Sequence, residues 1–537
     1  MARIRVLIRA NVKRIKDSDA LAYNGFAHAP MTIESNLKEM ERGREAYWQR
    51  YPSTSPLKLR WRAIAVRHCL HVLPGETILE LGAGSGLWTQ HLTDVLKGRN
   101  RIVAAVFNDD LAQAADQKQL ANVEVVLAKD LESQFARESF DYIVGTAILC
   151  HNAYAHNLRL LRDLLKPGGQ ILFFEANHWN PQVFLKNVVP ALGRWAGHSA
   201  CQVSMRKYQL MKVASHQGFT AIEVVPFDIV HPRAPRSLVR ALQSLSYVVE
   251  HAPFIKETCG TLYIWARKPG GPAARNVVDL CEHPQLFGST SVVVPCHNEE
   301  MNIFPLVRGL TGMYGRYIHE IILVNDNSHD GTAQAAREMA ARDPRVRVIN
   351  RTPPNGVGLA LRDGYRAATG KYILSMDCDF LLILPELRDL FDAIARGRDG
   401  AIGSRFSYDS MLIHYPFAKI LANRAFHALA NLVLGLRARD LSNNLKLYKA
   451  DILKGLEIDQ PHFAANAETG LKPVLAGYDI EEVPISWINR DIDMGASTFR
   501  VIKVAPGYLR ALLHLVWHGR RAKEAPRAAR AAARSDS

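Results

Sequence analysis

The sequence contains no run of about 18 apolar residues, the length that a membrane-spanning helix requires, so we expect no transmembrane segment. It has only seven cysteines in 537 residues, and none of them form a C-x-x-C pair. That scarcity argues against a structural zinc site. An odd number of scattered cysteines is typical of a reducing compartment rather than of a disulfide-bonded secreted protein.

Acidic residues are in the minority. Lys and Arg number 67 against 52 Asp and Glu, so the formal net charge is +15. An excess of this size suggests an anionic partner, such as a phosphate, a nucleic acid or an acidic membrane surface. No segment matches a nucleic-acid-binding motif, so we expect no nucleic-acid partner. The 48% of apolar residues fits a folded protein, and the length predicts several domains.

Both ends of the chain are basic. The first sixteen residues contain no acid and lack the apolar core and cleavage site of a secretory signal; Ile4, Leu7, Ile8, Val12 and Ile15 recur there at helical spacing. This pattern predicts a basic amphipathic helix. A docking helix with a solvated face, or a mitochondrial presequence, would have a similar composition.

Residues 501–537 contain an apolar stretch, Leu509–Trp517, followed by an Ala/Arg-rich tail. The tail and the first helix would together hold the protein peripherally at an anionic membrane, on the cytoplasmic face, since each basic residue near such a surface contributes about 1 kcal/mol. A solvated charged tail is the alternative.

Short apolar runs alternate with helical segments in both halves of the chain. The first half has seven such runs, from 77–81 to 261–266, and the second begins at 291–295 and continues through 320–325, 346–350, 372–377 and 401–404. Alternating strands and helices predict an α/β protein with parallel, doubly wound sheets. Pro and Gly cluster at 268–275 between the two halves, which indicates a linker.

A glycine loop follows the first predicted strand. Gly82, Gly84 and Gly86 lie in ILELGAGSGLWTQHL, and Glu80 ends the strand. Glycines at this position permit a tight turn and close approach of the backbone to a ligand. Polar side chains follow the second and third strands, at Asn108, Asp109 and Asp130.

Together these segments resemble the class I S-adenosylmethionine-dependent methyltransferases over residues 45–268. The resemblance implies a Rossmann-like seven-stranded domain that binds S-adenosylmethionine through Glu80, Gly82, Gly84, Gly86 and Asp130. The ribose-binding acid of the family aligns with Asn108, with Asp109 one position later, and an amide holds a hydroxyl more weakly than a carboxylate does. A purely structural glycine turn is the alternative.

The methyl acceptor is not identified by these motifs. His151 follows the fourth strand, and Glu175, Asn177 and His178 follow the fifth. Because the carboxyl ends of these strands face the cofactor cleft in this architecture, His151 and His178 are candidate bases. A structural role for either histidine is the alternative.

An acid pair, Asp377 and Asp379, ends a strand in the second half. Two carboxylates one residue apart can hold a hard divalent metal against a diphosphate, and the metal would neutralise charge on a leaving nucleotide diphosphate. A D-x-D sequence alone is common by chance. The segments SVVVPCHNEE and EIILVNDNSHDGT precede it at an ordered spacing.

This half resembles family 2 glycosyltransferases with a GT-A fold over residues 289–495, and within them the dolichyl- or polyprenyl-phosphate sugar synthases such as the mannosyltransferases. The resemblance implies that Pro295, Glu299 and Asp326 contact the nucleotide and that Asp377 and Asp379 hold Mg²⁺ or Mn²⁺. It assigns phosphate-binding, catalytic or acceptor-side roles to further residues: Arg405, Arg424, Arg490, Lys446 and Glu468.

A lipid phosphate is already anionic at neutral pH, so it needs no base but does need cations beside the donor. Arginine suits this because guanidinium pairs bidentately with phosphate oxygens. The chain departs from the family at Asn325, Leu381 and Asn443. Leu381 stands where the synthases often have a glutamine that assists the metal, and it cannot ligate.

The sequence therefore predicts a bifunctional enzyme: a basic segment (1–44), a methyltransferase domain (45–268), a linker (269–288), a GT-A domain (289–500) and a basic tail (501–537). The predicted activities are methyl transfer from S-adenosylmethionine and inverting transfer of a hexose from a GDP- or UDP-sugar to a polyprenyl phosphate. One alternative is a glycosyltransferase with a non-lipid glycan acceptor. Another is a degenerate nucleotide-binding scaffold at the membrane.

Overall fold

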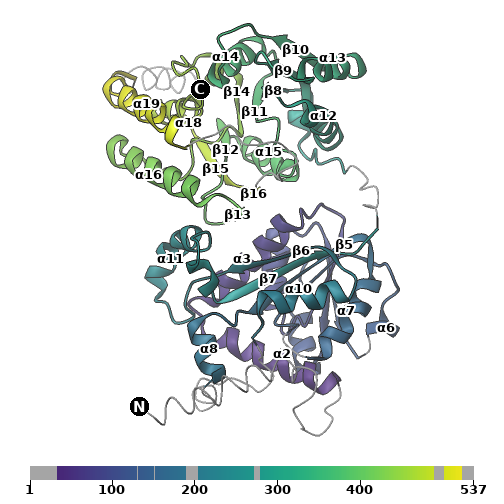
Figure 1. Cartoon of the computed structure of the whole chain (residues 1–537). Coiled ribbons are helices and arrows are strands. Elements are labelled where there is room, and N and C mark those ends of the chain that lie inside the picture. The colour runs from purple at the N-terminus through teal and green to yellow at the C-terminus, as the bar shows by residue number, and fades with distance from the viewer. Residues whose placement is uncertain are drawn as a thin grey trace, which may run out of the picture.

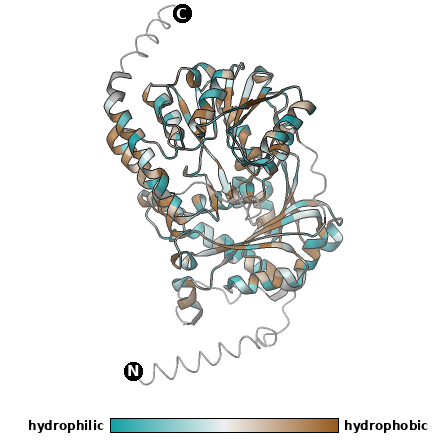
Figure 2. Ribbon diagram, turned by 45° about the horizontal axis from the view of Figure 1, so that its top comes forward, coloured by the Kyte–Doolittle hydropathy of each residue, from teal (hydrophilic) through white to brown (hydrophobic). Residues whose placement is uncertain are grey.

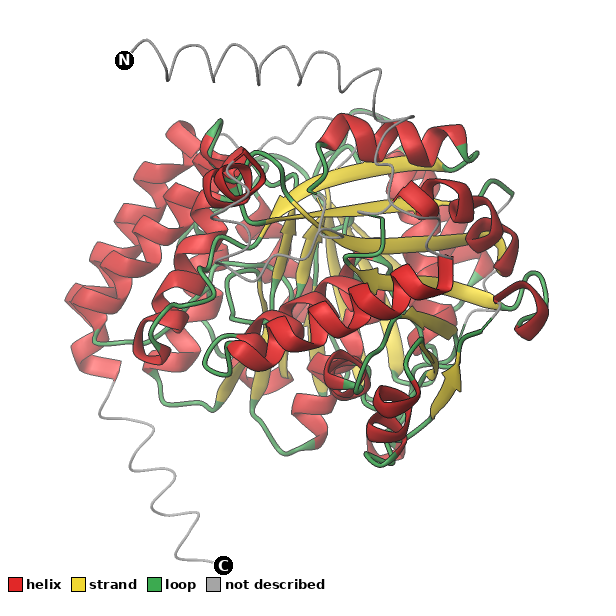
Figure 3. Cartoon of the chain, turned by 90° about the horizontal axis from the view of Figure 1, so that it is seen from below, coloured by secondary structure: helices red, strands yellow, loops and turns green. Residues whose placement is uncertain are grey.

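The computed structural model describes residues 33–129, 131–149, 152–188, 204–270, 278–488 and 501–522. Two seven-stranded sheets, one from each half of the chain, form the two bodies in Figure 1. Helices cover the strands of both sheets, as the red and yellow elements of Figure 3 show. The α/β class and the division into two α/β units are confirmed.

The first sheet has the strand order β3-β2-β1-β4-β5-β7-β6. Its strands are β1 (Thr77–Leu81), β2 (Arg101–Val106), β3 (Val123–Leu127), β4 (Phe140–Thr146), β5 (Leu165–Ala176), β6 (Thr220–Phe227) and β7 (Thr261–Arg267). All seven predicted strands form. The expectation of a wholly parallel sheet was wrong at one position, because β7 runs antiparallel to both β5 and β6.

Helices of this half alternate with the strands. They are α2 (Ile33–Arg50), α3 (Ser55–Cys69), α4 (Leu87–Val95), α5 (Asp109–Asp116), α6 (Leu131–Gln134), α7 (Asn152–Leu164), α8 (Pro181–Val188), α10 (Lys207–His216), α11 (Arg236–Val249) and the short η1 (Ile255–Thr258). Each connection between neighbouring parallel strands needs a crossover of this kind, and the crossovers leave the strand ends free to bind a ligand.

The second sheet has the order β10-β9-β8-β11-β14-β12-β15. Its strands are β8 (Thr290–Cys296), β9 (Ile318–Asn325), β10 (Val346–Asn350), β11 (Tyr372–Ser375), β12 (Gly400–Ser404), β14 (Lys446–Lys449) and β15 (Ile480–Pro484). β14 is antiparallel to β11 and β12, so this sheet too is mixed rather than wholly parallel. β13 (Met411–Ile413) and β16 (Ser486–Ile488) form a separate pair.

Helices of the second half are η2 (Pro284–Leu286), α12 (Glu300–Tyr314), α13 (Thr332–Arg342), α14 (Val357–Ala367), η3 (Leu384–Glu386), α15 (Leu387–Ala395), α16 (Phe417–Leu434), α17 (Ala450–Lys454), α18 (Ala465–Leu475) and α19 (Val501–Ala522). α19 packs against α16 and α18, and its Ala511, Leu512 and Leu515 are buried. The region expected as a tail thus begins with a docked helix.

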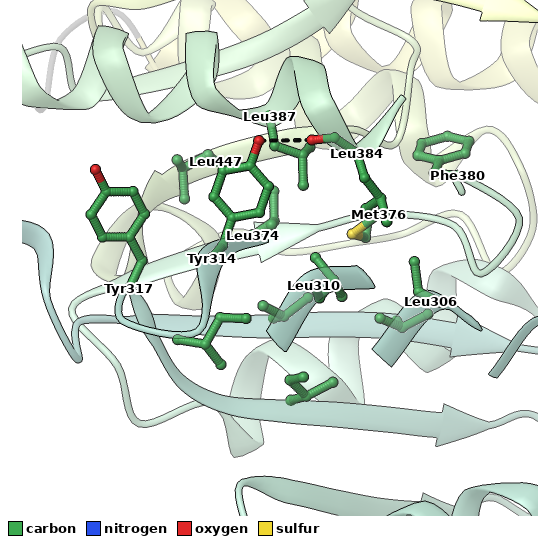
Figure 4. Packing of buried hydrophobic residues seen from close by; sticks show 14 of the residues in the cluster. Leu306, Leu310, Tyr314, Tyr317, Leu374, Met376, Phe380, Leu384, Leu387 and Leu447 are labelled. Carbon is green, nitrogen blue, oxygen red and sulfur yellow. Dashed lines mark hydrogen bonds between the residues drawn. The ribbon is translucent and has the colours of Figure 1, made fainter. Parts of the chain in front are cut away.

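The core of the second half forms around α12 and the central strands (Figure 4). Leu306, Leu310 and Leu374 are fully buried in it. The Tyr314 hydroxyl donates a hydrogen bond of 2.7 Å to the carbonyl oxygen of Leu384, which satisfies a polar group inside an apolar core. Leu280, Cys281 and Leu286, within the expected linker, are buried in the same cluster.

The two halves of the chain meet through both apolar and polar contacts. Met411 and Ile413 of β13 belong to the same hydrophobic cluster as Leu59 and Trp61 of α3. The Glu386 carboxylate, which is 3% exposed, accepts a hydrogen bond from the Ser486 amide at 2.6 Å and lies 2.8 Å from His68 Nδ1.

We predict that Glu386→Ala destabilises the protein strongly, because it leaves the buried Ser486 amide and His68 without their acceptor. Loss of one partner of a buried pair typically costs about 3–5 kcal/mol, measured here by urea unfolding. Glu124→Ala is the control, since its pair with Arg101 is more than half exposed and should contribute about 0–1 kcal/mol. Equal losses in the two variants would contradict the prediction.

Candidate active sites

A cavity of about 740 Å³ opens at the carboxyl ends of β8, β9 and β11. These three strands are neighbours in the second sheet, so residues far apart in the sequence meet at one edge. The predicted nucleotide and metal residues all line this cavity: Pro295, Glu299, Asp326, Asp377 and Asp379. The sheet order is therefore the reason that the separate motifs form one site.

Asp377 is held in place by a chain of hydrogen bonds. Asn444 Nδ2 donates to Asp377 Oδ1 at 2.6 Å, and Asn444 Oδ1 accepts from the Ser375 hydroxyl at 2.8 Å. The Tyr365 hydroxyl donates to Ser375 at 2.9 Å. Asn444 follows the predicted Asn443, whose Nδ2 donates to the carbonyl oxygen of Gly403 at 2.8 Å. Carboxylates fixed in this way are preorganised to bind a cation.

Asp326 stabilises the loop before α14. Its Oδ2 accepts a hydrogen bond from the Gly356 amide at 2.7 Å, and its other oxygen pairs with the Arg351 guanidinium. Neighbouring Asn325 donates to Asn350 Oδ1 at 3.0 Å. Leu381, which replaces a possible ligand, packs instead against the hydrophobic core.

Arg405 lines the cavity and is fixed by a buried carboxylate. Its Nε and Nη2 donate to the two oxygens of Asp440 at 2.6 and 2.8 Å, and its Nη1 donates to the Tyr415 hydroxyl at 3.2 Å. Burial opposes the charge on Arg405, but the Asp440 carboxylate beside it outweighs burial and raises its pKa. The guanidinium therefore stays charged where an anion can reach it.

The other predicted residues of this half lie elsewhere. Arg424 donates to the carbonyl oxygen of Arg439 at 3.0 Å and stacks over Phe406. The Glu468 carboxylate is buried and accepts from the amides of Asp459 and Gln460 at 3.0 and 2.8 Å. Neither residue is part of the described cavity lining.

Lys446 is also buried. Its ammonium donates to the carbonyl oxygens of Asn443 and Asn466 at 2.6 and 3.0 Å, and burial lowers its pKa to about 7. Lys446 thus stabilises the backbone around the site through these two hydrogen bonds. Arg490 lies outside the described residues.

Helices α16 and α19 lie beside each other (Figure 1), and residues of both line a largely apolar wall of the cavity. The side chains on this wall are Ala422, Ala425, Phe426, Leu429, Val504, Ala505 and Leu509. Lys419 and Asn423 supply polar groups on α16. One cavity therefore combines carboxylates, a fixed guanidinium and an apolar wall.

A second candidate site lies at the carboxyl end of β1. Gly82, Gly84 and Gly86 have φ angles of 66°, 58° and 74°, which favour glycine because they are left-handed. Glu80 is 1% exposed, and its Oε2 has no hydrogen-bond partner among the described residues. Burial raises the pKa of Glu80 to about 7.

Helix α2 lies across this glycine loop. Glu41, 1% exposed, accepts hydrogen bonds from the Gly84 amide at 3.0 Å and the Phe107 amide at 2.9 Å. It also accepts from Asn108 Nδ2 at 2.8 Å. Arg44 donates to the carbonyl oxygen of Thr146 at 2.5 Å and to that of Gly82. Charged side chains of α2 thus form hydrogen bonds with backbone groups of the loop.

Two family models match the chain at these sites. Residues 56–213 match the ubiE/COQ5 methyltransferase family, and residues 291–456 match glycosyl transferase family 2. The chain joins a methyltransferase domain to a family 2 glycosyltransferase domain. This confirms the resemblances found in the sequence and their order along the chain.

Two similar proteins are named as enzymes that transfer mannose to a lipid phosphate. The chain is 29% identical over 241 residues to a polyprenol monophosphomannose synthase of Mycolicibacterium smegmatis, covering 42% of this chain and 88% of the relative. It is 28% identical over 200 residues to a dolichol-phosphate mannosyltransferase of Pyrococcus furiosus, covering 37% of this chain and 56% of the relative.

Solved structures resemble each domain at low identity. A glucosyl-3-phosphoglycerate synthase from Mycobacterium tuberculosis is 19% identical with a TM-score of 0.34, covering 42% of this chain and 79% of that one. A possible histamine N-methyltransferase from Thermotoga maritima is 17% identical with a TM-score of 0.31, covering 43% and 99%.

The methyltransferase fold implies S-adenosylmethionine as methyl donor, and the strand-end residues have the chemistry to hold it. An added Cβ at Gly84 would lie 2.7 Å from Oε2 of the flexible Glu45 side chain of α2, and the φ angle of 58° there itself favours glycine. Buried Asn108 occupies the position before α5, and exposed Asp109 begins that helix. Glu41 holds the Gly84 amide and Asn108 Nδ2, so a cofactor that used these donors would have to displace its carboxylate.

Glu175 and the candidate base His178, both near the end of β5, make contacts with neighbouring residues. Glu175 accepts hydrogen bonds from the amides of Ile148 and Leu149 at 2.8 and 2.7 Å. His178 Nδ1 lies 2.9 Å from the Ser204 hydroxyl; burial, then nearby Arg206, lowers the pKa of His178.

Asn177 Nδ2, beside these residues, donates to the carbonyl oxygens of Glu257 and Cys259, each at 2.8 Å. It therefore anchors the turn before β7. Asp130 and His151 lie outside the described residues, so their predicted roles stay predictions.

Sequence reasoning missed Glu41, Arg44 and Glu45. A signal was present, because these residues share a helical face with buried Met40 and Trp48. Charged residues on an otherwise apolar face indicate a specific partner. The expected boundary at 44/45 divided α2, so this helix was not considered as one element.

We predict that Glu80→Gln makes the protein more stable at pH 8 but not near pH 4.5. The folded carboxyl, with a pKa of about 7, keeps its proton in a range where the unfolded one, near 4.5, loses it. Stability from this group therefore falls as pH rises from about 4.5 to 7, by up to about 3 kcal/mol. Urea unfolding at both pH values measures it.

The exposed Glu124→Gln variant is the control for general pH effects. A stability difference between Glu80→Gln and the unmodified protein that does not change with pH would contradict the assignment of a raised pKa to Glu80.

Proposed function

We propose that the glycosyltransferase domain transfers a hexose from a GDP- or UDP-sugar to a polyprenyl phosphate, with inversion at the anomeric carbon. The observation that carries the proposal is the single 740 Å³ cavity, in which Asp377 and Asp379 share one space with Arg405 and the apolar wall of α16 and α19. A nucleotide sugar needs the two carboxylates, which can hold a metal. A lipid phosphate needs the Arg405 guanidinium for its phosphate and the apolar wall for its chain.

The donor end has the chemistry for a diphosphate. Asp377 and Asp379 would hold Mg²⁺ or Mn²⁺, and such a cation offsets negative charge on the leaving nucleotide diphosphate. Asp377 is aligned for this by Asn444. Pro295, Glu299 and Asp326 line the same end and are proposed to contact the nucleotide.

The acceptor end favours a lipid phosphate over a neutral sugar hydroxyl. A hydroxyl nucleophile needs a general base, whereas a phosphate is already anionic and needs a cation to bind it beside the donor. Arg405 is such a cation, and its hydrogen bonds to Asp440 and Tyr415 fix the guanidinium at the cavity wall. The phosphate oxygen would then attack the anomeric carbon in line with the departing diphosphate.

The outer faces of α16 and α19 support access from a membrane. Leu432 and Trp517 are 81% and 83% exposed, and Leu513 of α19 is also exposed. Figure 2 shows brown and teal residues alternating along the helix before the grey C-terminal trace. No helix in the described ranges is long and apolar enough to span a bilayer. We propose peripheral contact with an anionic lipid surface.

The relatives' names agree with a polyprenyl acceptor, since they are polyprenol- and dolichol-phosphate mannose enzymes. They support mannose as the first sugar to test. The covalent link to a methyltransferase domain further suggests that both products belong to one glycan or glycolipid.

We predict that Asp379→Asn lowers sugar transfer at least 100-fold, because removing a metal-ligating charge weakens both the metal site and charge stabilisation. The assay follows label from GDP-mannose or other nucleotide sugars into organic solvent in the presence of Mg²⁺ or Mn²⁺ and a short polyprenyl phosphate. Asp451→Asn, an exposed acid on α17, is the control and should keep full activity.

The other outcomes distinguish the alternatives. Donor hydrolysis without lipid label would indicate a glycan acceptor in place of the lipid. Complete absence of donor turnover in the unmodified protein would overturn the proposal in favour of a nucleotide-binding scaffold.

For the methyltransferase domain we propose methyl transfer from S-adenosylmethionine bound over Glu80, the glycine loop and Asn108. S-adenosylmethionine supplies an electrophilic methyl group when bound, while His151 or His178 would accept a proton from the methyl acceptor. Glu41 must first release the Gly84 and Phe107 amides, so α2 acts as a cover whose movement precedes cofactor binding.

We predict that Glu41→Ala tightens binding of S-adenosylhomocysteine about five- to tenfold, because the variant frees two amides and Asn108 that Glu41 otherwise occupies. Isothermal titration calorimetry measures the Kd. Glu39→Ala, an exposed residue of the same helix, is the control. Weaker binding by Glu41→Ala would show that Glu41 holds the cofactor rather than competing with it.

A further inference from the structure

The segment that follows Arg405 is held by the methyltransferase domain. Tyr247 of α11 is 9% exposed, and its hydroxyl lies 2.5 Å from the carbonyl oxygen of Ser407 and 3.1 Å from that of Ser410. Its single proton is shared between two carbonyl groups of one turn. Gln243, one helical turn earlier, donates to the carbonyl oxygen of Tyr408 at 2.6 Å.

Apolar contacts connect the same helix to Arg405 itself. The Tyr247 ring lies 6.1 Å from the ring of Phe406, the residue next to Arg405. Phe406 lies 6.4 Å from the ring of Tyr415, whose hydroxyl accepts from Arg405 Nη1. α11 also packs against α16 (Figure 1), and α16 forms part of the apolar wall of the first cavity.

Close packing alone does not fix this segment. A second cavity, of about 330 Å³, lies between the domains and is bordered by Gln243, Tyr247, Tyr408 and Tyr415. Tyr415 also lines the active cavity, so it forms part of both walls. The turn has restraints of its own, such as the hydrogen bond of 2.6 Å from the Ser410 hydroxyl to the carbonyl oxygen of Ser404. With open space on this side, the hydrogen bonds from α11 add a restraint that the glycosyltransferase domain does not supply.

We propose that Tyr247 of the methyltransferase domain is a positioning residue for sugar transfer, which acts through the 406–410 segment on Arg405. The proposal rests on the proposed role of Arg405 in binding the acceptor phosphate. It makes the methyltransferase domain a structural part of the glycosyltransferase site, whether or not a methyl group is transferred.

The test is a double-mutant cycle in the full-length protein with Tyr247→Phe and Arg405→Lys. Tyr247→Phe keeps the ring but removes the hydroxyl, so we expect the KM for polyprenyl phosphate to rise about five- to tenfold while the KM for the nucleotide sugar stays within twofold. In the Arg405→Lys background the same change should have less than a twofold effect, because residues that act through one another are not additive.

Lys97→Ala is the matched control. Lys97 crosses the same domain boundary, with its ammonium 2.8 Å from Asp389, but does not touch the 406–410 segment. We expect this variant to leave both KM values unchanged. Equal effects of Tyr247→Phe in the two Arg405 backgrounds, or equal effects of Lys97→Ala and Tyr247→Phe, would overturn the proposal.

A second measurement does not depend on sugar transfer. Hydrogen–deuterium exchange of peptides covering 404–415 should be at least tenfold faster in Tyr247→Phe than in the unmodified protein, and unchanged in Lys97→Ala. Unchanged exchange in Tyr247→Phe would overturn the proposal even if the unmodified protein transferred no sugar. Faster exchange together with an inactive unmodified protein would instead count against the proposed function alone.

Discussion

The buried ion pair between Arg405 and Asp440 is the interaction on which the glycosyltransferase site most depends. Asp440 is fully buried, so its charge would be unfavourable without a matched cation. Arg405 supplies that cation through two hydrogen bonds. Burial alone would raise the pKa of Asp440, but the neighbouring Arg405 guanidinium and further favourable contacts outweigh burial and lower it. The pair joins the end of β12 to the segment after α16, and it places a permanent positive charge in the cavity.

Contacts between the two domains also restrain the segment that carries Arg405. The 405–415 segment leaves the glycosyltransferase sheet, contacts α11, contributes β13 to the boundary and returns at Tyr415. Glu386 secures a second point of the same boundary through His68 and Ser486. A fusion built only as a tether would need neither contact. These contacts connect the two domains at the loop that carries Arg405, which lines the cavity of the glycosyltransferase domain.

In the methyltransferase domain a buried charged group is bonded to backbone amides rather than to an opposite charge. Glu41 accepts hydrogen bonds from the Gly84 amide of the glycine loop and from the Phe107 amide that follows β2. A buried carboxylate bonded in this way holds α2 against the loop. If the cofactor binds over the loop as proposed, it would compete with Glu41, and its affinity would depend on the position of α2.

The sequence by itself determined the α/β class, the order of the two domains and the motif residues at strand ends, because periodicity and glycine placement are local properties. It could not show that β7 and β14 run antiparallel, since strand direction depends on distant partners. Only the tertiary structure brought Asn444 to Asp377, placed Glu468 outside the cavity lining and set Glu41 on the glycine loop. Each of these contacts joins segments that no local pattern relates, so packing alone decides them.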